Sequence, residues 1–217
     1  MRWILVVTAL IALTLAVFAL WPALDLAVAH VFYDRGGFIG HDGLERFARD
    51  FFRVAPFVVL AAYIALYALR RAGVALFWAP TGLGVIFVIA TLAIGPGLIV
   101  NLGLKDHAHR PRPVHVVEFG GPYAFRPWYR FDGACKINCS FVSGEAASGF
   151  WMVAPALVAP PPWRAPAVAG ALVFGAAASV LRLAFGGHFL SDVLLGGLIS
   201  LLVVLVARRL LWPKGGP

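Results

Sequence analysis

Long apolar stretches without a charged side chain set the strongest limit on what this chain can fold into. A helix needs about 20 mostly apolar residues to cross the hydrocarbon core of a bilayer. Six stretches come near that length, at residues 3–24, 54–69, within 72–104, 146–163, 165–181 and 193–207. The sequence therefore predicts an all-α fold, a bundle of six transmembrane helices that forms one domain over residues 1–217.

Composition and charge agree with a membrane protein. Hydrophobic residues make up 61% of the chain and charged residues only 13%, whereas soluble domains have about half and about a quarter. The net charge of +8 would suggest a nucleic-acid partner in a soluble protein, but the basic residues stand between the apolar stretches and form no continuous stripe. We therefore expect a bilayer and no nucleic acid as partner, and the sequence does not indicate an oligomeric state.

The basic residues also predict the orientation of the chain. With six spans, one side of the membrane holds no acidic residue and the basic residues Arg2, Arg70, Arg71, Arg164, Arg208, Arg209 and Lys214. The total number of basic residues favours the opposite orientation, but short connections dense in Lys and Arg stay in the cytoplasm. The segments 25–53 and 105–145 are then predicted to face the periplasm of a bacterial inner membrane.

Two shorter features concern the N-terminal part of the chain. The first apolar stretch follows a single arginine and lacks a clear small-residue cleavage site, which favours a retained anchor over a cleaved signal peptide. Residues 42–52 combine charged side chains with Leu44, Phe47, Phe51 and Phe52 at helical spacing. This pattern predicts a short amphipathic helix on the membrane interface, in the first outer segment.

Ionisable residues gather where three predicted spans begin or end, all on the outer side. They form three groups: Lys105 followed by Arg112-Pro113, the run Ser143-Gly144-Glu145, and Arg182 followed by His188 and Asp192. Charges at membrane depth are costly, so such residues are candidates for a functional site.

The first candidate role is phosphate binding. A phosphate ester carries up to two negative charges, and Lys105, Arg112 and Arg182 can supply cationic donors around it. The alternative for these side chains is contact with the membrane interface or lipid headgroups. The backbone N–H groups of Ser143 and Gly144, at a predicted helix N-terminus, form a natural anion site. We predict that these five residues bind phosphate.

The three groups resemble the signature of the type 2 phosphatidic acid phosphatase (PAP2) superfamily of membrane lipid phosphatases. That signature reads Lys, six residues, Arg-Pro; then Pro-Ser-Gly-His; then Ser-Arg, five residues, His, three residues, Asp. The spacing of the first and third blocks matches, and the six-span plan fits. The chain departs from the family at Val142 for proline, at Glu145 for histidine and at Leu181 for serine.

This resemblance implies a catalytic mechanism without a metal or another cofactor. His188 is predicted to attack phosphorus and form a phosphohistidine that water later hydrolyses. Asp192 stands four residues after His188, on the same helix face if the last helix begins near Gly187. We expect Asp192 to bond one imidazole nitrogen and leave the other free to attack. A structural helix contact is the alternative for this pair.

Glu145 is the most informative departure from the family. The family's histidine at this position donates a proton to the leaving alkoxide. Glu145 is predicted to act as this general acid and to shift the activity optimum toward acid pH, since only a protonated carboxyl can donate. Two alternatives stay open: Glu145 caps the helix or pairs with an arginine, or His107 or His109 donates the proton.

Three more features of the outer segment 105–145 have two interpretations each. The group Asp106, His107, His109 and His115 could bind a metal, although ordinary loop histidines are more common. Arg110, between His109 and Pro111, could contact a second phosphate or be a loop charge. Cys135 and Cys139 could form a disulfide in an oxidising periplasm, or remain two thiols.

With this resemblance, the sequence predicts a membrane lipid phosphatase that acts on a phosphate monoester or diphosphate. Residues 118–121 and 138–141 look similar to the bacterial branch that includes lipid A phosphatases. Undecaprenyl diphosphate, phosphatidylglycerophosphate and phosphatidate stay open as substrates. The alternatives are a lipid phosphotransferase with the same site and a non-catalytic protein that binds or transports anionic lipids. The pair His188 and Asp192 argues against the last, since binding alone needs no oriented nucleophile.

Overall fold

The computed structural model describes residues 1–41, 43–105 and 107–213, which form helices and one two-stranded hairpin. The elements are α1 (Arg2–Leu20), α2 (Ala23–Val31), β1 (Tyr33–Asp34), β2 (Gly37–Phe38), α3 (Gly43–Arg71), α4 (Gly82–Leu92), the π-helical segment η2 (Ala93–Lys105), α5 (Gly144–Trp151), α6 (Val153–Val158), α7 (Pro161–Ala184) and α8 (Leu190–Leu211). Single turns of 3-10 helix cover Ile39–His41 (η1), Pro113–His115 (η3) and Val117–Phe119 (η4). The hairpin is antiparallel, with Tyr33 opposite Phe38.

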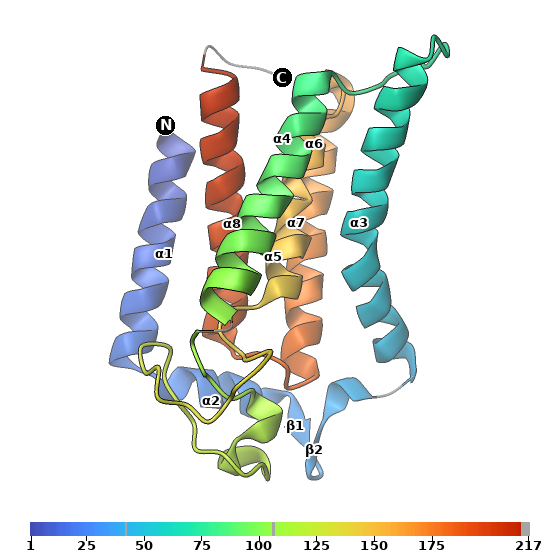
Figure 1. Ribbon diagram of the computed structural model, residues 1–217. Helices are drawn as coiled ribbons and strands as arrows, with labels where there is room; N and C mark the ends of the chain where they lie inside the picture. The colour runs from blue at the N-terminus through green and yellow to red at the C-terminus, as the bar shows by residue number, and fades with distance from the viewer. Residues whose placement is uncertain (42, 106, 214–217) are drawn as a thin grey trace.

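Five helices among the described residues are long and apolar enough to cross a membrane. They are Arg2–Leu20, Glu45–Arg71, Gly82–Lys105, Pro161–Ala184 and Leu190–Leu211. Figure 1 shows them side by side, with α2, the hairpin and the segment after η2 gathered at one end of the bundle. The predicted helical membrane fold is confirmed to this extent.

The predicted span at residues 146–163 is not one long helix. α5 ends at Trp151, α6 runs only from Val153 to Val158, and Trp163 already belongs to α7. Pro155 explains the break, because a proline ring clashes with the carbonyl four residues earlier, here that of Trp151. Both short helices consist mostly of buried residues. This stretch therefore forms the centre of the bundle and is too short to count among the five long helices.

The predicted amphipathic helix at residues 42–52 is not a separate element either. Asp42 lies outside the described residues, and the residues after it form the first turns of α3, which continues to Arg71. The short helix that lies across the end of the bundle is instead α2 (Figure 1). As a result, Arg49 and Arg53 belong to a long helix that packs against α5.

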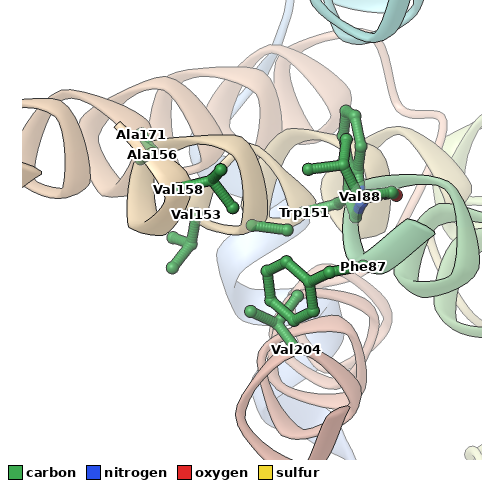
Figure 2. Packing of buried hydrophobic residues seen from close by; sticks show 9 residues of the cluster. Phe87, Val88, Trp151, Val153, Ala156, Val158, Ala171 and Val204 are labelled. Carbon is green, nitrogen blue, oxygen red and sulfur yellow. Dashed lines mark hydrogen bonds between the residues drawn. The ribbon is translucent and has the colours of Figure 1, made fainter. Parts of the chain in front are cut away.

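The core of the bundle forms around the indole ring of Trp151. This side chain is fully buried and packs with Phe87, Val88 and Val204, from α4 and α8 (Figure 2). The indole N–H donates to the Thr91 hydroxyl at 3.0 Å, so the buried polar group has a partner. Trp151 thereby fixes α5 between α4 and α8.

The start of α5 touches α8 at Gly196. A Cβ atom at this position would lie 2.5 Å from the backbone oxygen of Ser143, too close for any residue except glycine. The Ser143 N–H also donates to the backbone oxygen of Asp192 at 3.0 Å. These contacts join the N-terminal ends of α5 and α8.

We predict that Gly196→Ala destabilises the protein, because the backbone of α5 has to move to admit the methyl group; overpacking of this kind costs about 1–3 kcal/mol. Thermal unfolding of the detergent-purified protein measures the effect. Gly170→Ala in α7 is the matched control, since a Cβ there meets nothing within 4 Å and alanine is the better helix former. Equal melting temperatures for the two variants would contradict the prediction.

Candidate active site

The three groups of ionisable residues predicted from the sequence meet at the end of the bundle that carries α2. His188 lies in the turn between α7 and α8 and is only 2% exposed. Its Nδ1 lies 2.7 Å from the backbone oxygen of Ser140. A carbonyl oxygen can only accept, so Nδ1 carries the proton and Nε2 keeps a free lone pair.

Asp192 is close to His188 but does not hydrogen-bond it. Its Oδ2 lies 3.9 Å from the imidazole Nδ1, and instead accepts from the Ser140 hydroxyl at 2.5 Å and from the Phe189 N–H at 2.9 Å. α8 begins at Leu190 and not near Gly187, so His188 lies outside the helix. The direct bond expected between Asp192 and the imidazole is thus replaced by a link through Ser140.

Arg110 forms the most heavily bonded side chain in the site. It is 1% exposed, and its guanidinium donates to Asp192 at 2.6 Å, to Asp25 at 2.7 Å and to the Ser191 hydroxyl at 2.8 Å. Burial alone would lower the pKa of Arg110, but the charges of Asp192 and Asp25 raise it above its ordinary value. The two carboxylates therefore keep Arg110 charged inside the protein, and it is not a loop charge in solvent.

Asp25 completes this network from the opposite side. It belongs to α2, is 1% exposed, and accepts from the backbone N–H of Ser191 at 2.9 Å and from the Ser191 hydroxyl at 2.7 Å. One arginine thus joins two buried carboxylates from two helices.

Three cations surround His188. Burial, followed by the charges of Arg182, Arg112 and Lys105, lowers the pKa of His188 well below its usual range. Arg182 packs directly against the turn, because a Cβ at Gly187 would lie 2.1 Å from its Nη2. The imidazole is therefore neutral at pH values at which an exposed histidine would be protonated.

Glu145 pairs with two arginines. Its carboxylate lies 3.3 Å from Arg49 Nη2 and 3.5 Å from Arg182 Nε. Arg49 comes from α3 and Arg182 from α7, so Glu145, in the first turn of α5, stands between two long helices. Of the alternatives, the arginine pair is thus present in the structure.

Two cavities are lined by the residues around this cluster, although His188 itself lines neither of them. One, of about 340 Å³, is lined by Arg49, Arg112, His115, Asn138, Arg182 and Gly187, among others. The second, of about 180 Å³, is lined by Arg53, Phe57, Asn101, Lys105, Gly144, Glu145 and Ser148. The predicted phosphate ligands are divided between them, and the pair of Glu145 with Arg182 connects the two. Ser143 is buried at the cap of α5, where its hydroxyl accepts from the Ala146 N–H.

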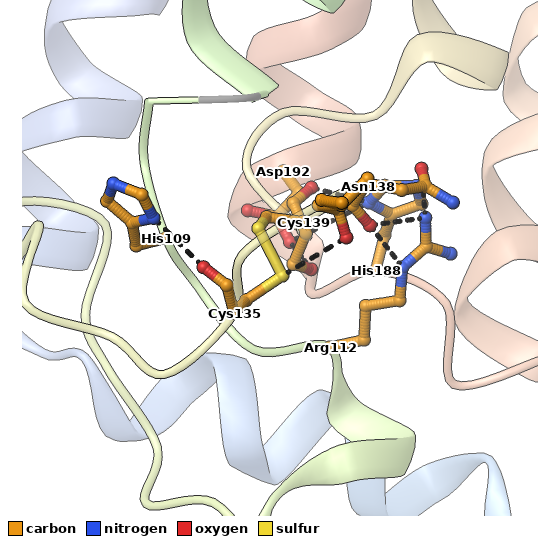
Figure 3. The surroundings of a disulfide bond; sticks show 9 residues. His109, Arg112, Cys135, Asn138, Cys139, His188 and Asp192 are labelled. Atoms are coloured by element: carbon orange, nitrogen blue, oxygen red, sulfur yellow. Dashed lines mark hydrogen bonds and ion pairs between the residues drawn. A yellow bond between two sulfur atoms is a disulfide. The ribbon is translucent and has the colours of Figure 1, made fainter.

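A disulfide fixes the loop that faces the cations. Cys135 and Cys139 are bonded, which decides between the two interpretations of these cysteines (Figure 3). Between them, Asn138 accepts from Arg112 through its backbone oxygen at 2.9 Å and its side-chain oxygen at 2.7 Å. Ser140, which follows the disulfide, holds His188. The short disulfide loop therefore orders both a cation and the imidazole.

The outer-loop histidines do not form a metal site in the described part of the chain, where no group of three His, Cys, Asp or Glu side chains is arranged for one. Asp106 lies outside that part. His107 Nδ1 contacts the Gly103 oxygen at 2.8 Å, and His109 Nδ1 contacts the Cys135 oxygen at 2.9 Å. His115 alone of these lines the larger cavity.

The sequence interpretation missed Asp25, Ser140, Asn138 and Arg49 as parts of the site. The sequence does contain an indication for Asp25, because this carboxylate directly follows an apolar stretch, where a charge is costly. Ser140 acts on His188 through its backbone oxygen, which its residue type does not reveal. Arg49 falls within residues 42–52, for which the sequence predicts an amphipathic helix on the membrane interface.

We predict that Arg110→Met greatly reduces folding stability, because it leaves Asp25 and Asp192 buried without a counter-charge. Removing one partner of a buried ion pair typically costs about 3–5 kcal/mol. The yield and melting temperature of purified protein measure the loss. Arg130→Met, which breaks the exposed pair with Asp132, should leave both nearly unchanged. Equal behaviour of the two variants would argue against the network.

Comparisons with known proteins identify the family of this chain. The model of the PAP2 superfamily matches residues 84–215. The chain is 35% identical over 201 residues to "Lipid A 4'-phosphatase" of Francisella tularensis subsp. novicida, covering 91% of this chain and 90% of the relative. It is 35% identical over 204 residues to the protein of the same name from Rhizobium leguminosarum, covering 87% and 88% of the two chains. No solved structure matches. The chain belongs to the PAP2 superfamily, and it is a membrane phosphatase that hydrolyses phosphoric monoesters.

Proposed function

We propose that this enzyme removes a phosphate group from lipid A through a covalent intermediate on His188. The observation that carries the proposal is the imidazole whose Nδ1–H is held by the Ser140 oxygen at 2.7 Å, beside the cations Arg112 and Arg182. An oriented, neutral imidazole next to an anion site is suited to nucleophilic attack on phosphorus. The names of the relatives support lipid A as the substrate.

In the first step, Nε2 of His188 attacks phosphorus and the bond from phosphorus to the sugar oxygen breaks. Lys105, Arg112 and Arg182 balance the charge on the phosphoryl oxygens, with the N–H group of Gly144. The predicted contact from the Ser143 N–H is not available, because that group donates to the Asp192 backbone oxygen at 3.0 Å. The attacking form is the neutral imidazole. Because the pKa of His188 lies well below its usual range, we expect no loss of this form as the pH falls to about 6.5.

The positive charge that develops on the imidazole needs a negative partner. Asp192 lies 3.9 Å from Nδ1, and Ser140 connects the two through its hydroxyl and its backbone oxygen. We propose that Asp192 stabilises the positive charge on the imidazole and holds the Ser140 loop in place.

Glu145 transfers a proton in each step, first as the acid and then as the base. Its carboxyl donates to the leaving sugar oxygen, and its carboxylate then takes a proton from the water that attacks the phosphohistidine. Hydrolysis returns His188 and releases inorganic phosphate, so the protons balance over the cycle. Substrate phosphate competes with Glu145 for Arg182, which lies 3.5 Å from the carboxylate, and so frees the carboxyl for proton transfer.

The lipid part of the substrate approaches from the bilayer. The smaller cavity is lined by residues of α3, of η2 and of α5. Two of these elements belong to helices that are apolar enough to cross the membrane: α3, and η2 together with α4. We place this end of the bundle on the periplasmic side, with α5 and α6 as the sixth crossing.

The first test is phosphate release by purified protein in detergent containing EDTA. The panel contains lipid A, undecaprenyl diphosphate, phosphatidylglycerophosphate and phosphatidate, each with wild type and His188→Ala. We expect release from lipid A that chelator does not affect and that the variant lacks. Phosphate release from another lipid alone would change the proposed substrate and leave the proposed mechanism as it is.

Activity of His188→Ala equal to wild type would remove His188 as nucleophile. No release from any lipid by folded wild-type protein, followed by release on adding an alcohol acceptor, would favour phosphotransfer.

A second prediction concerns Glu145. Glu145→Gln should lower the rate of phosphate release by about 10²–10⁴, the usual contribution of a general acid. Wild type should reach its optimum at a lower pH than Glu145→His, because only the protonated carboxyl donates. Rates measured from about pH 4 to about pH 9 with the three proteins distinguish these outcomes. A Gln variant that keeps most of the wild-type rate across pH rules out the role.

A further inference from the structure

A further cavity with basic side chains lies at the opposite end of the bundle from His188. It holds about 160 Å³, the space of about five water molecules, and lies between α1 and α8. Its walls include Trp3 and Ile4 of α1, Leu205, Arg208 and Arg209 of α8, and Trp212. Figure 1 places both of these helix ends far from α2 and the outer loop.

The arginines of this cavity have no acidic partner in the described chain. The Nε of Arg208 is buried and makes no hydrogen bond, and Arg209 donates to the backbone oxygen of Pro213. The acidic side chains that the structure describes all belong to elements at the other end: α2, β1, the first turns of α3, α5 and α8, and the loop after η2. A buried N–H donor without a protein partner leaves room for a hydrogen bond to an external acceptor, and an anion suits the charge of these two arginines.

The aromatic side chains identify the depth of the cavity in the membrane. Trp3 lies beside Arg2, whose guanidinium is 5.8 Å from the ring centre, and Trp212 packs edge-on against Phe87 at 5.2 Å. Tryptophan and arginine at the end of a membrane helix stand at the level of the lipid headgroups. Ile4 and Leu205 continue the wall with apolar surface.

We propose that this cavity binds the phosphate headgroup of an anionic phospholipid, with its acyl chains along α1 and α8. Arg208 and Arg209 bind the phosphate oxygens, and the indole N–H groups can donate to the same headgroup. A net negative headgroup is favoured over a zwitterionic one, because no described carboxylate offsets the two arginines. The lipid would hold α1 against α8.

Delipidated protein in a neutral detergent, titrated with phosphatidylglycerol or phosphatidylcholine, tests this proposal. We expect native mass spectra to retain one phosphatidylglycerol, and the melting temperature to rise by roughly 3–6 °C at lipid concentrations about ten times the Kd. Phosphatidylcholine should give a much smaller shift. Arg208→Gln/Arg209→Gln should lose the retained lipid and the difference between the two lipids.

Arg71→Gln/Arg164→Gln is the matched control, because it removes two charges from the same end of the bundle but from outside this cavity. It should bind phosphatidylglycerol as wild type does. Equal loss in both double variants would overturn the proposal and leave only a general attraction by surface charge. Hydrolysis of a soluble phosphate monoester by each variant confirms that the protein is folded.

Discussion

The buried ion pairs of Arg110 are the interaction on which the site depends. A guanidinium without water is stable only when carboxylates and hydrogen-bond acceptors take the place of the solvent. Asp25 and Asp192 do so at 2.7 and 2.6 Å, and the Arg126 backbone oxygen accepts from Nε at 2.8 Å. Because these partners come from α2, α8 and the loop, the charge requirement of one side chain fixes three segments at once. Asp192 and the Ser140 loop are then held in place beside His188.

Charge is separated along the bundle, and each end uses it differently. At the end with α2, the carboxylates Asp25, Asp192 and Glu145 all pair with arginines. Of the cations around His188, Arg182 is thus ordered by Glu145 and Arg112 by Asn138 before a phosphate arrives, which reduces the reorganisation needed in the reaction. At the other end, Arg208 and Arg209 have no such internal partner among the described residues. The paired charges at the first end suit phosphate hydrolysis, and the unpaired arginines at the second end suit the binding of an anionic lipid headgroup.

Apolar length predicted the long helices better than the two short helices at the centre of the bundle. The stretches that became α1, α7 and α8 carry the required number of apolar residues in one helix. The stretch at 146–163 has the same composition, but Pro155 breaks it beside Trp151, and its two halves are buried by their neighbours. Hydropathy cannot tell a helix buried by protein from one that faces lipid, since both are apolar. Residues 43–52 have the charged and apolar pattern of an interfacial helix, but they form the first turns of α3. A local pattern does not show that the helix continues.

The sequence by itself determined the membrane helices, the three groups of ionisable residues and the family, because length, charge and spacing are local properties of a chain. Lys105, Arg112, Arg182 and His188 could be placed at one end of the bundle from the span ends alone. Only the tertiary structure decided that Ser140 holds His188, that Arg49 reaches Glu145, and that Asp25 binds Arg110. The last two bonds join residues 96 and 85 positions apart. Such pairs depend on how the helices pack. A buried charge pairs with an opposite charge that lies close in space, and the spacing of residues in the sequence does not show which charge that is.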